Sequence, residues 1–386
     1  MYFIGLMSGT SADGIDLALV RFTKHEHNDQ ATIELVASYF QSYQAELAQR
    51  IKSFYDSGNH EIDLAGSLDI ELAHLFSKAI ITFLQQKNIP ADAITAIGNH
   101  GQTIRHRPSG EFPFTLQIGC SQTLACLTGI NVVGQFRQKD IALGGQGAPL
   151  VPAFHQQLFN NAEIDVFFVN IGGIANISYL PKLKEKSVQG FDTGPGNALL
   201  DDWFVHCNPE SKHCYDESGQ WGSLGTVNQP LLAQLLSDPY FSVVAPKSTG
   251  REYFTFAWLE QQLSRFTESS AVSISAQDIQ ATLVALTANS ITDEIKKLSQ
   301  KAKVITCGGG VHNDSLMKQL ANSLHEEGSQ NRYDLVTASE LGIDGDSLEA
   351  MAFAWLAYAH VNEIKSNMPS VTGASHHCVL GLSYSP

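Results

Sequence analysis

The chain has few basic residues for its length. Its 386 residues include 24 Lys and Arg against 39 Asp and Glu, giving a formal net charge of -15. A negative field of this size repels polyphosphate backbones, and no local basic stripe interrupts it, so we expect no nucleic-acid partner. An anionic ligand would instead have to be held by backbone N–H groups, helix N-termini or a metal ion.

Cysteines and long hydrophobic runs are also scarce. The six cysteines are too irregularly spaced for a disulfide framework in a chain of this length. No stretch approaches the ~20 apolar residues that span a bilayer, and the apolar segment Met1–Met7 has no basic flank of the secretory kind. Segment 206–214 holds two His and two Cys, but no second cluster completes a metal site. We therefore expect a cytoplasmic protein with reduced thiols, no membrane partner and no metal-ligating side chains.

The chain does contain the same strand pattern twice. The apolar runs Tyr2–Leu6 and Ile15–Phe22 flank a polar turn, which predicts a strand, a turn and a strand. The runs Val166–Asn170 and Ile174–Leu180 repeat this arrangement around a turn with two glycines. In each half a third strand and then helical sequence follow. This repeat predicts a duplicated α/β fold with two similar lobes.

The length supports two lobes as well. A chain of 386 residues with 43% hydrophobic content is long for a single core. We expect lobe I to comprise residues 1–132 together with 366–386, and lobe II to comprise residues 133–365. The active site is expected in a cleft between the lobes.

Three glycine-bearing turns are candidate nucleotide-binding elements. Gly9–Gly14 and Asn170–Asn176 follow the first strand of each half, and Gly308–Gly310 lies between a strand and a helix. Alone, the first two are more simply explained as hairpin turns, and close packing of helix on strand is the alternative explanation for the third. As a duplicated pair, however, the first two predict backbone clamps for a triphosphate. Three consecutive glycines exceed what packing needs and predict a surface for adenine or ribose.

Two polar segments are candidates for the chemistry. Asp192 is the last residue of the predicted strand Val188–Asp192 and precedes a Gly-Pro-Gly turn that opens a helix. A carboxylate there is either a helix cap or, at the carboxyl edge of a sheet, a general base, and we favour the base. The segment Gly98–His106 supplies donors and acceptors suited to a sugar or its acyl group. The expected sugar contacts are His100, Gln102, Thr103 and, from a later helix, Glu349.

Taken together, these motifs resemble the anhydro-N-acetylmuramic acid kinase family, and the resemblance covers nearly the whole chain. The segments that carry it are Gly5–Asp16, Gly98–Thr103, Ala142–Pro152, Asn170–Asn176, Phe191–Asn197, Pro246–Glu252, Gly308–Asn313, Glu349–Ala357 and Thr372–Ala374.

The resemblance implies the two-lobed, duplicated ribonuclease-H-like fold of actin, hexokinase and heat-shock ATPases. It implies an enzyme of peptidoglycan recycling that uses ATP, Mg²⁺ and water to convert 1,6-anhydro-N-acetylmuramic acid into N-acetylmuramic acid 6-phosphate. A homodimer is the assembly we consider. The implied site residues are Asp192 as catalytic base and, for ATP, Gly9, Thr10, Ser11, Ala12, Asp13, Gly14, Ile15, Asp16, Asn170, Gly172, Gly173, Gly308, Gly309 and Gly310.

One position departs from the family pattern. The family usually has an acid before Phe136-Arg137, whereas this chain has Gln135, with Asp140 nearby. Two other functions stay open from the residues alone. A generic hexose or N-acetylhexosamine kinase would phosphorylate a free sugar hydroxyl, and an actin-like ATPase switch or filament would bind no sugar. Activity with ordinary N-acetylmuramic acid would favour the first, and sugar-dependent ADP release would exclude the second.

Overall fold

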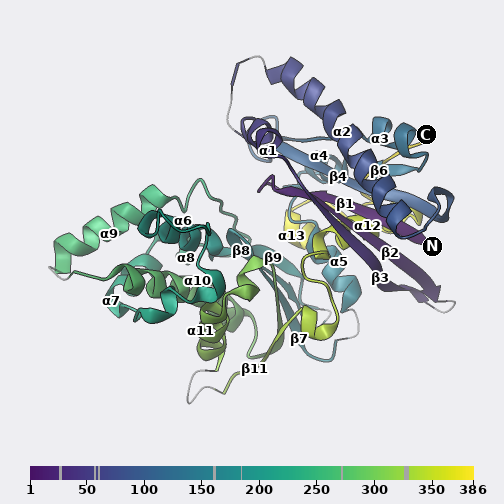
Figure 1. Cartoon of the computed structure of the whole chain (residues 1–386). Coiled ribbons are helices and arrows are strands. Elements are labelled where there is room, and N and C mark those ends of the chain that lie inside the picture. The colour runs from purple at the N-terminus through teal and green to yellow at the C-terminus, as the bar shows by residue number, and fades with distance from the viewer. Residues whose placement is uncertain are drawn as a thin grey trace. The chain divides into compact units, whose positions relative to one another are not determined.

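The computed structural model describes residues 1–25, 28–55, 58–59, 61–159, 162–183, 185–270, 273–325 and 330–386. These residues form two compact units (Figure 1). The first unit comprises Met1–Leu158 and Ser347–Pro386, and the second comprises Phe159–Asp346. Each unit has its own β-sheet and its own hydrophobic core.

The sheet of the first unit runs in the order β12-β6-β4-β1-β2-β3, with β5 paired to β4. Strands β1, β2 and β3 form an antiparallel meander, while β4 is parallel to β1 and β6 is parallel to β4. The strands are β1 (Tyr2–Ser8), β2 (Gly14–His25), β3 (Asn28–Ser42), β4 (Ile94–Arg107), β5 (Phe114–Ile118), β6 (Val132–Gly134) and β12 (Leu382–Tyr384).

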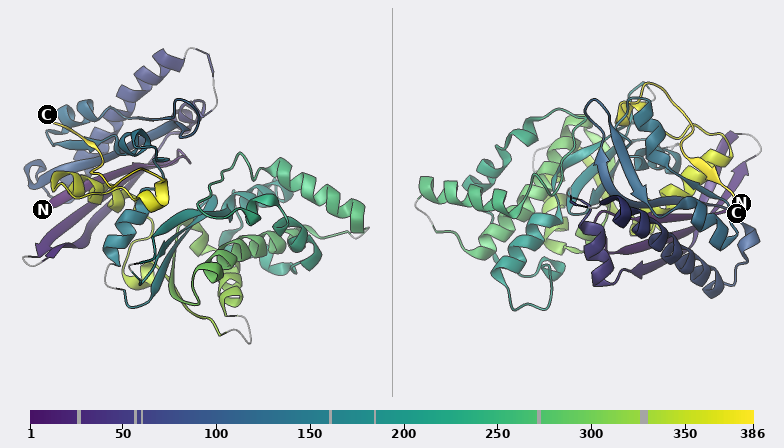
Figure 2. Two further views of the ribbon diagram at one scale, coloured as in Figure 1. Left: turned by 180° about the vertical axis from the view of Figure 1, so that it is seen from behind. Right: turned by 90° about the horizontal axis from the view of Figure 1, so that it is seen from above.

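Helices cover both faces of this sheet (Figure 2). Alternate residues of β1 point to opposite faces, so Ile4 packs in one core with Leu72 of α2, while Phe3 contacts Tyr358 of α12. The helices of this unit are α1 (Ala45–Lys52), α2 (Glu61–Gln86), α3 (Ser121–Thr128), α4 (Phe136–Ala142), α5 (Val151–Leu158), α12 (Leu348–Val361) and α13 (Pro369–Thr372).

The second unit has the sheet order β11-β10-β7-β8-β9. Its strands are β7 (Asp165–Ile171), β8 (Ile174–Leu180), β9 (Gln189–Pro195), β10 (Lys301–Cys307) and β11 (Arg332–Thr337). Its helices are α6 (Asn197–Cys207), α7 (Gln229–Leu236), α8 (Pro239–Ser242), α9 (Phe256–Ser270), α10 (Ala276–Leu298) and α11 (Asp314–Leu324). Short 3₁₀ helices in the two units span Ala91–Ala93, Glu217–Gly219, Gly222–Leu224, Gly309–His312 and Ser339–Leu341.

The two sheets share one topology, which confirms the predicted duplication. The order β3-β2-β1-β4-β6 in the first unit corresponds to β9-β8-β7-β10-β11 in the second. In both, three strands form an antiparallel meander and two further strands run parallel to the first. The predicted fold class, a duplicated α/β fold of two lobes, is therefore that of the chain.

The compact units divide the chain at other positions than the predicted lobes. Residues 133–158 and 347–365, which were expected in lobe II, belong to the first unit. The reason is the close packing of α12 on β1 and β4. A Cβ on Gly5 would overlap the carbonyl oxygen of Ala350, and one on Gly98 would overlap that of Phe353, so glycine lets the helix approach the sheet. The cleft expected between the lobes stays a prediction.

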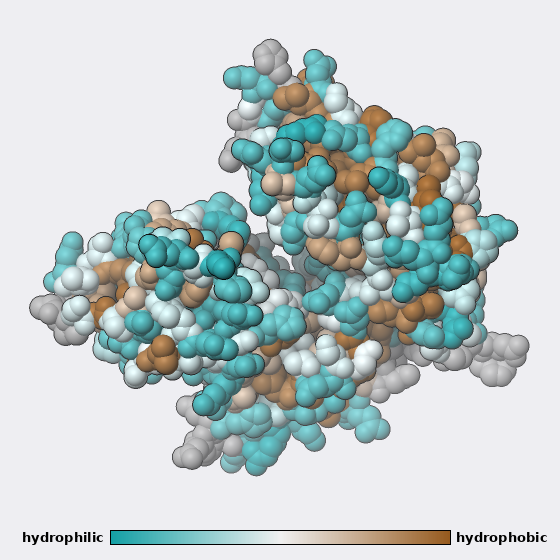
Figure 3. Space-filling view, in the orientation of Figure 1, coloured by the Kyte–Doolittle hydropathy of each residue, from teal (hydrophilic) through white to brown (hydrophobic). Residues whose placement is uncertain are grey.

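The surface is predominantly hydrophilic on the face drawn in Figure 3, where smaller hydrophobic areas lie between polar ones. Within the described ranges, no helix combines the length and the apolar character that crossing a membrane requires.

Candidate active site

A buried cluster of hydrogen bonds holds the turn between β1 and β2. Ser8 and Gln102 are both fully buried. The Ser8 hydroxyl donates to Gln102 Oε1 at 2.6 Å, and Gln102 Nε2 donates to the carbonyl oxygen of Gly9 at 3.0 Å. The Tyr55 hydroxyl donates to the carbonyl oxygen of Thr10 at 2.8 Å. These bonds fix the backbone at the start of the turn in one arrangement.

The turn itself is tight. The Ala12 N–H donates to the carbonyl oxygen of Gly9 at 3.1 Å, and Ala12 adopts a φ of 52° in the left-handed region. The Ser11 hydroxyl donates to Asp13 Oδ1 at 2.8 Å. A Cβ on Gly14 would meet the carbonyl oxygen of Gln41 at 2.5 Å, so packing against β3 explains that glycine. A Cβ on Gly9 would meet nothing nearer than Ser11 Oγ at 3.5 Å, which leaves this backbone approachable.

Asp13 and Asp16 are the carboxylates of this region. Asp13 is exposed, Asp16 is partly buried, and the Ile15 side chain between them lies in the hydrophobic core. Among the residues that the structure describes, no group of three or more His, Cys, Asp or Glu side chains could hold a metal ion. Mg²⁺ in phosphoryl-transfer enzymes takes one or two carboxylates and otherwise phosphate and water oxygens. Asp13 and Asp16 are therefore side chains of the kind that Mg²⁺ takes in such enzymes.

His100 is a buried, neutral side chain. Its Nε2 accepts a hydrogen bond from Arg137 Nη2 at 2.9 Å, and its ring packs on Phe353 with centroids 4.6 Å apart. Burial and the Arg137 charge hold the pKa of His100 well below its usual value. Burial also lowers the pKa of Arg137 to about 10, against the opposing effect of the Glu349 and Asp140 carboxylates. His100 thus orients the Arg137 guanidinium.

Glu349 lies in the first turn of α12 with its side chain exposed. Although the side chain keeps an exposed surface, the protein atoms packed around its carboxyl group raise the pKa of Glu349, whereas the Arg137 charge lowers it and the Asp13 charge raises it. Thr103 is half-buried, and its Oγ1 accepts from Gln117 Nε2 at 3.1 Å. The first unit therefore brings Glu349 together with the His100–Arg137 pair and with the carboxylate of the β1–β2 turn.

Gln102 differs from the other residues expected to contact the sugar. It has no exposed surface, and both ends of its amide group are engaged with the β1–β2 turn. This placement favours support of the turn over a direct contact with a ligand. The sequence did not indicate this role for Gln102, because its partner Ser8 lies 94 residues away in the chain.

A pocket of about 400 Å³ lies within the first unit beside His100. Its lining includes Asn99, Gln117 and Gln135. Gln135 precedes α4 in the left-handed region, with a φ of 55°, and its side chain is exposed. The position at which the family usually has an acid therefore lies in the same pocket as His100.

Asp140 does not take the place of that acid. It is fully buried and accepts hydrogen bonds from Gly147 N at 2.8 Å, Thr372 Oγ1 at 2.8 Å and Asn367 Nδ2 at 3.3 Å. These contacts join the glycine-rich segment after α4 to the C-terminal part of the chain. Asp140 is accordingly a structural residue of the first unit.

In the second unit, the β7–β8 turn is bonded to the start of α6. The carbonyl oxygen of Gly172 accepts from Asn197 N at 2.8 Å, and that of Gly173 accepts from Gly196 N at 3.0 Å. A Cβ on Gly196 would overlap the Gly172 carbonyl oxygen. Glycine at position 196 is therefore required for the helix to approach the turn this closely.

The three glycines after β10 have two different explanations. Gly308 has a φ of 82°, and a Cβ there would overlap Asn170 Oδ1. A Cβ on Gly310 would overlap the side chain of Ile171. On Gly309, by contrast, the nearest atom would be Asn197 Nδ2 at 3.6 Å. Packing thus explains two of the glycines and places them beside the β7–β8 turn, while the space above Gly309 is open.

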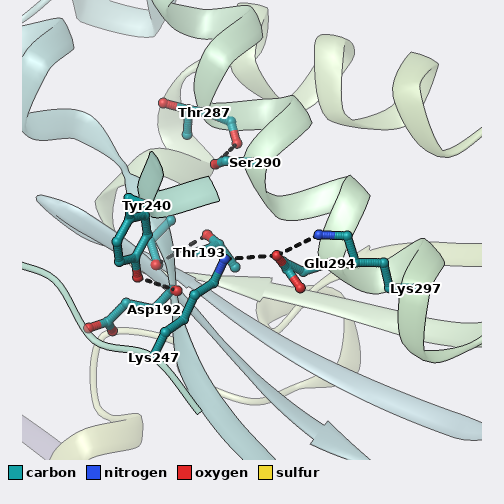
Figure 4. A network of polar contacts seen from close by, with 9 residues as sticks. Asp192, Thr193, Tyr240, Lys247, Thr287, Ser290, Glu294 and Lys297 are labelled. Atoms are coloured by element: carbon teal, nitrogen blue, oxygen red, sulfur yellow. Dashed lines mark hydrogen bonds and ion pairs between the residues drawn. The ribbon is translucent and has the colours of Figure 1, made fainter. Parts of the chain in front are cut away.

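Asp192 lies in β9, and Figure 4 shows it beside Tyr240 and Lys247. Its Oδ2 accepts from the Ser248 hydroxyl at 2.7 Å and from Thr249 N at 3.0 Å. Its main-chain carbonyl oxygen accepts from the Tyr240 hydroxyl at 2.7 Å. Burial raises the pKa of Asp192, the Thr249 and Ser248 donors lower it, and the Glu252 charge raises it. A carboxylate with a raised pKa and a fixed orientation is suited to accept a proton.

The two donors to the Asp192 carboxylate come from a segment to which the sequence assigned no role. Pro246–Glu252 carries Ser248 and Thr249, and the sequence showed it only as part of the family resemblance. The same segment supplies Arg251, whose Nε lies 3.3 Å from the position of a Cβ on Gly173. The sequence signal available was a Lys-Ser-Thr-Gly-Arg run of polar residues with no period of a helix or strand.

Comparison with known proteins identifies the family. The family model described as anhydro-N-acetylmuramic acid kinase matches residues 1–386. A protein of that name from Colwellia psychrerythraea is 57% identical, covering 100% of this chain and 97% of the relative. One from Shewanella denitrificans is 48% identical over 100% of this chain and 98% of its own. A solved ROK family glucokinase from Streptomyces griseus with glucose and AMPPNP is 10% identical, with a TM-score of 0.41, over 92% of this chain and 99% of its own. The chain belongs to the anhydro-N-acetylmuramic acid kinase family.

Proposed function

We propose that this chain is an ATP-dependent kinase that opens the 1,6-bridge of 1,6-anhydro-N-acetylmuramic acid with water and transfers the γ-phosphoryl group to O6. The product is N-acetylmuramic acid 6-phosphate, an intermediate of peptidoglycan recycling. Relatives of this name match the chain over its full length. The observation that carries the proposal is the Asp192 carboxylate, whose Oδ2 is held by two donors and whose pKa is raised by burial.

The chemical structure of the substrate explains why the reaction needs a base. In a 1,6-anhydro sugar O6 is bonded to the anomeric carbon, so there is no free 6-hydroxyl to attack ATP. Water attacks the anomeric carbon and the C1–O6 bond breaks. O6 forms a new bond to the γ-phosphorus as the bond from the γ-phosphorus to the bridging oxygen breaks, and ADP leaves. Asp192 takes the proton of the attacking water. Because both described donors bind Oδ2, the other carboxylate oxygen is the one directed to the water.

ATP is held chiefly by backbone groups in this proposal. The turn from Gly9 to Asp16 and the segment of Asn170, Gly172 and Gly173 bind phosphates, and Gly308–Gly310 receives the adenosine. The open backbone at Gly9 and at Gly309 supports this assignment. Mg²⁺ would be held by the phosphates with Asp13 and Asp16, and it would neutralise the charge that develops on the transferred group.

The sugar contacts are proposed in the first unit. They are His100, Thr103 and Glu349. Arg137, which is hydrogen-bonded to His100, is proposed to contact the sugar as well. Gln102 is proposed to act through the β1–β2 turn. A cytoplasmic location and a homodimer are also part of the proposal, and cell fractionation and analytical sedimentation test them.

A coupled assay of ADP release tests the function. The proposal predicts turnover with 1,6-anhydro-N-acetylmuramic acid, and little with N-acetylmuramic acid or N-acetylglucosamine, whose 6-hydroxyl is free. Asp192→Asn should bind ATP and sugar yet lose ~100 to 10,000-fold in kcat. Preferential turnover of the reducing sugars would identify a generic amino-sugar kinase instead. ADP release without any sugar dependence would identify an ATPase switch.

A further inference from the structure

Lys247 is a buried cation in the second unit. Its side chain is only 2% exposed, and its Nζ donates to Glu294 Oε1 of α10 at 2.9 Å (Figure 4). Lys297, one turn later on α10, reaches the same oxygen at 3.0 Å, but its side chain is 57% exposed. The two lysines therefore share one carboxylate and differ in burial.

The main chain of Lys247 is bonded directly to Asp192. The Asp192 N–H donates to the Lys247 carbonyl oxygen at 3.1 Å. The next two residues, Ser248 and Thr249, donate to Asp192 Oδ2. In the segment Lys247–Thr249, the side chain of the first residue is thus bonded to α10, and the other two residues donate hydrogen bonds to the Asp192 carboxylate.

Tyr240 forms a second link between the same two residues. The Lys247 ammonium lies 5.0 Å from the centroid of the Tyr240 ring, within the range of a cation–π interaction. The Tyr240 hydroxyl donates to the Asp192 carbonyl oxygen at 2.7 Å. The buried ammonium accordingly contacts a residue that supports the main chain of Asp192.

Stability alone is a weak explanation for a pair of this kind. Removing two charges from water is costly, and well-packed apolar residues often stabilise a core equally well. An ion pair does, however, impose a direction and a distance that an apolar contact lacks. The Lys247–Glu294 pair is next in the chain to the donors of Asp192, so a fixed direction and distance in this pair bear on the orientation of the Asp192 carboxylate.

We propose that the Lys247–Glu294 pair positions Asp192 for proton abstraction by fixing the segment Lys247–Thr249 against α10. The inference rests on the proposed role of Asp192 as the base. Lys247 is a positioning residue, because its ammonium acts on the reaction through Ser248, Thr249 and Tyr240.

The proposal predicts a shift in pH dependence as well as a loss of rate. The groups that act on the Asp192 carboxylate are the Thr249 N–H and the Ser248 hydroxyl, which lower its pKa, and Glu252, which raises it. Tyr240 contacts its main chain. The base works when it is ionised. If the donors are held less well, the pKa of Asp192 rises, and the acid limb of the kcat profile moves to higher pH.

Lys247→Met and Lys297→Met form a matched pair for the test. Lys247→Met should lower kcat by roughly 100-fold, the scale expected for a misplaced catalytic group, and shift the acid limb upward, with KM for both substrates nearly unchanged. Lys297→Met, which leaves the buried pair intact, should keep the kcat and the pH profile of the unmodified enzyme. The double variant Lys247→Met with Glu294→Leu removes both charges and covers the case in which the single variant folds poorly.

The outcomes separate this inference from the proposed function. A folded Lys247→Met variant, or a folded double variant, with unmodified kcat and acid limb would overturn the positioning role. Equal losses in Lys247→Met and Lys297→Met would do the same. Asp192→Asn is measured alongside: if it is active, the proposed base itself fails, whereas if it is inactive while Lys247→Met is normal, only the positioning role fails.

Discussion

Ser8 and Gln102 form a fully buried hydrogen bond of 2.6 Å between β1 and β4. Through the same amide group, Gln102 also donates to the carbonyl oxygen of Gly9. The two strands and the turn that follows β1 are thus joined at one point. A substitution at Gln102 should therefore alter the geometry of the β1–β2 turn more than it alters contacts with a ligand further away.

Gln102→Ala should therefore weaken ATP binding more than sugar binding. The substitution removes the bonds from Gln102 to Ser8 and to the Gly9 carbonyl oxygen. Ser8 keeps its contacts with the Tyr43 hydroxyl and the Gly14 carbonyl oxygen, so we expect a loss of stability of only about 0.5–1.5 kcal/mol per bond. Calorimetric titration with ATP and with the sugar measures both affinities, and Gln86→Ala, at an exposed glutamine at the end of α2, is the control. A larger loss for the sugar than for ATP would instead support the direct sugar contact expected from the sequence.

Gly309 and Gly310 should respond differently to the same substitution. In Gly310→Val the new side chain would overlap Ile171, so we expect a less stable protein. In Gly309→Val it would enter open space, so we expect a stable protein that binds ATP at least 10-fold more weakly, a loss of about 1.4 kcal/mol. Thermal unfolding and nucleotide titration measure the two effects. Normal ATP affinity in a folded Gly309→Val variant would contradict the adenosine assignment.

Asp201 of α6 should make the stability of the protein depend on pH. Burial, with smaller contributions from Asp202 and Asp216, raises its pKa from 3.8 to about 7, against the opposing effect of Arg251. Between those two values the folded protein holds a proton that the unfolded chain releases. The free energy of unfolding contributed by this group is therefore present at low pH and is lost as pH rises toward 7.

Asp201→Asn removes that dependence. When melting temperatures are measured from pH 5 to pH 8, the melting temperature of the variant should rise relative to that of the unmodified protein as pH increases. Asp92→Asn, at an exposed carboxylate, serves as the control. A constant difference between Asp201→Asn and the unmodified protein across this range would show that the Asp201 pKa is not raised.

The duplicated fold was predictable because its signals are local. Apolar runs around a glycine turn recur in each half, and each run became a strand of the expected meander. The division between units was less predictable. Helix α12 follows the second unit in sequence but packs on β1 and β4, and the glycines that permit this, Gly5 and Gly98, resemble ordinary strand glycines until the helix is in place.

The site was predictable to a similar extent. Asp192 could be placed in a strand from the residues around it. Its donors could not, because Ser248 is 56 residues away in the sequence and no helical or strand period connects them. Glycines 308 and 310 suggested a ligand surface, which stays a proposal, and their contacts with Asn170 and Ile171 give a packing reason for glycine that the sequence did not show.

The central claim is that water opens the sugar ring with Asp192 as base while O6 takes the phosphoryl group. Turnover of 1,6-anhydro-N-acetylmuramic acid in heavy-oxygen water tests this directly. The product must be trapped quickly, because a free anomeric hydroxyl exchanges slowly with solvent. The account predicts that the label appears at the anomeric carbon and is absent from the phosphate, and that Asp192→Asn forms almost no labelled product. Label in the phosphate, or full activity of Asp192→Asn, would contradict it.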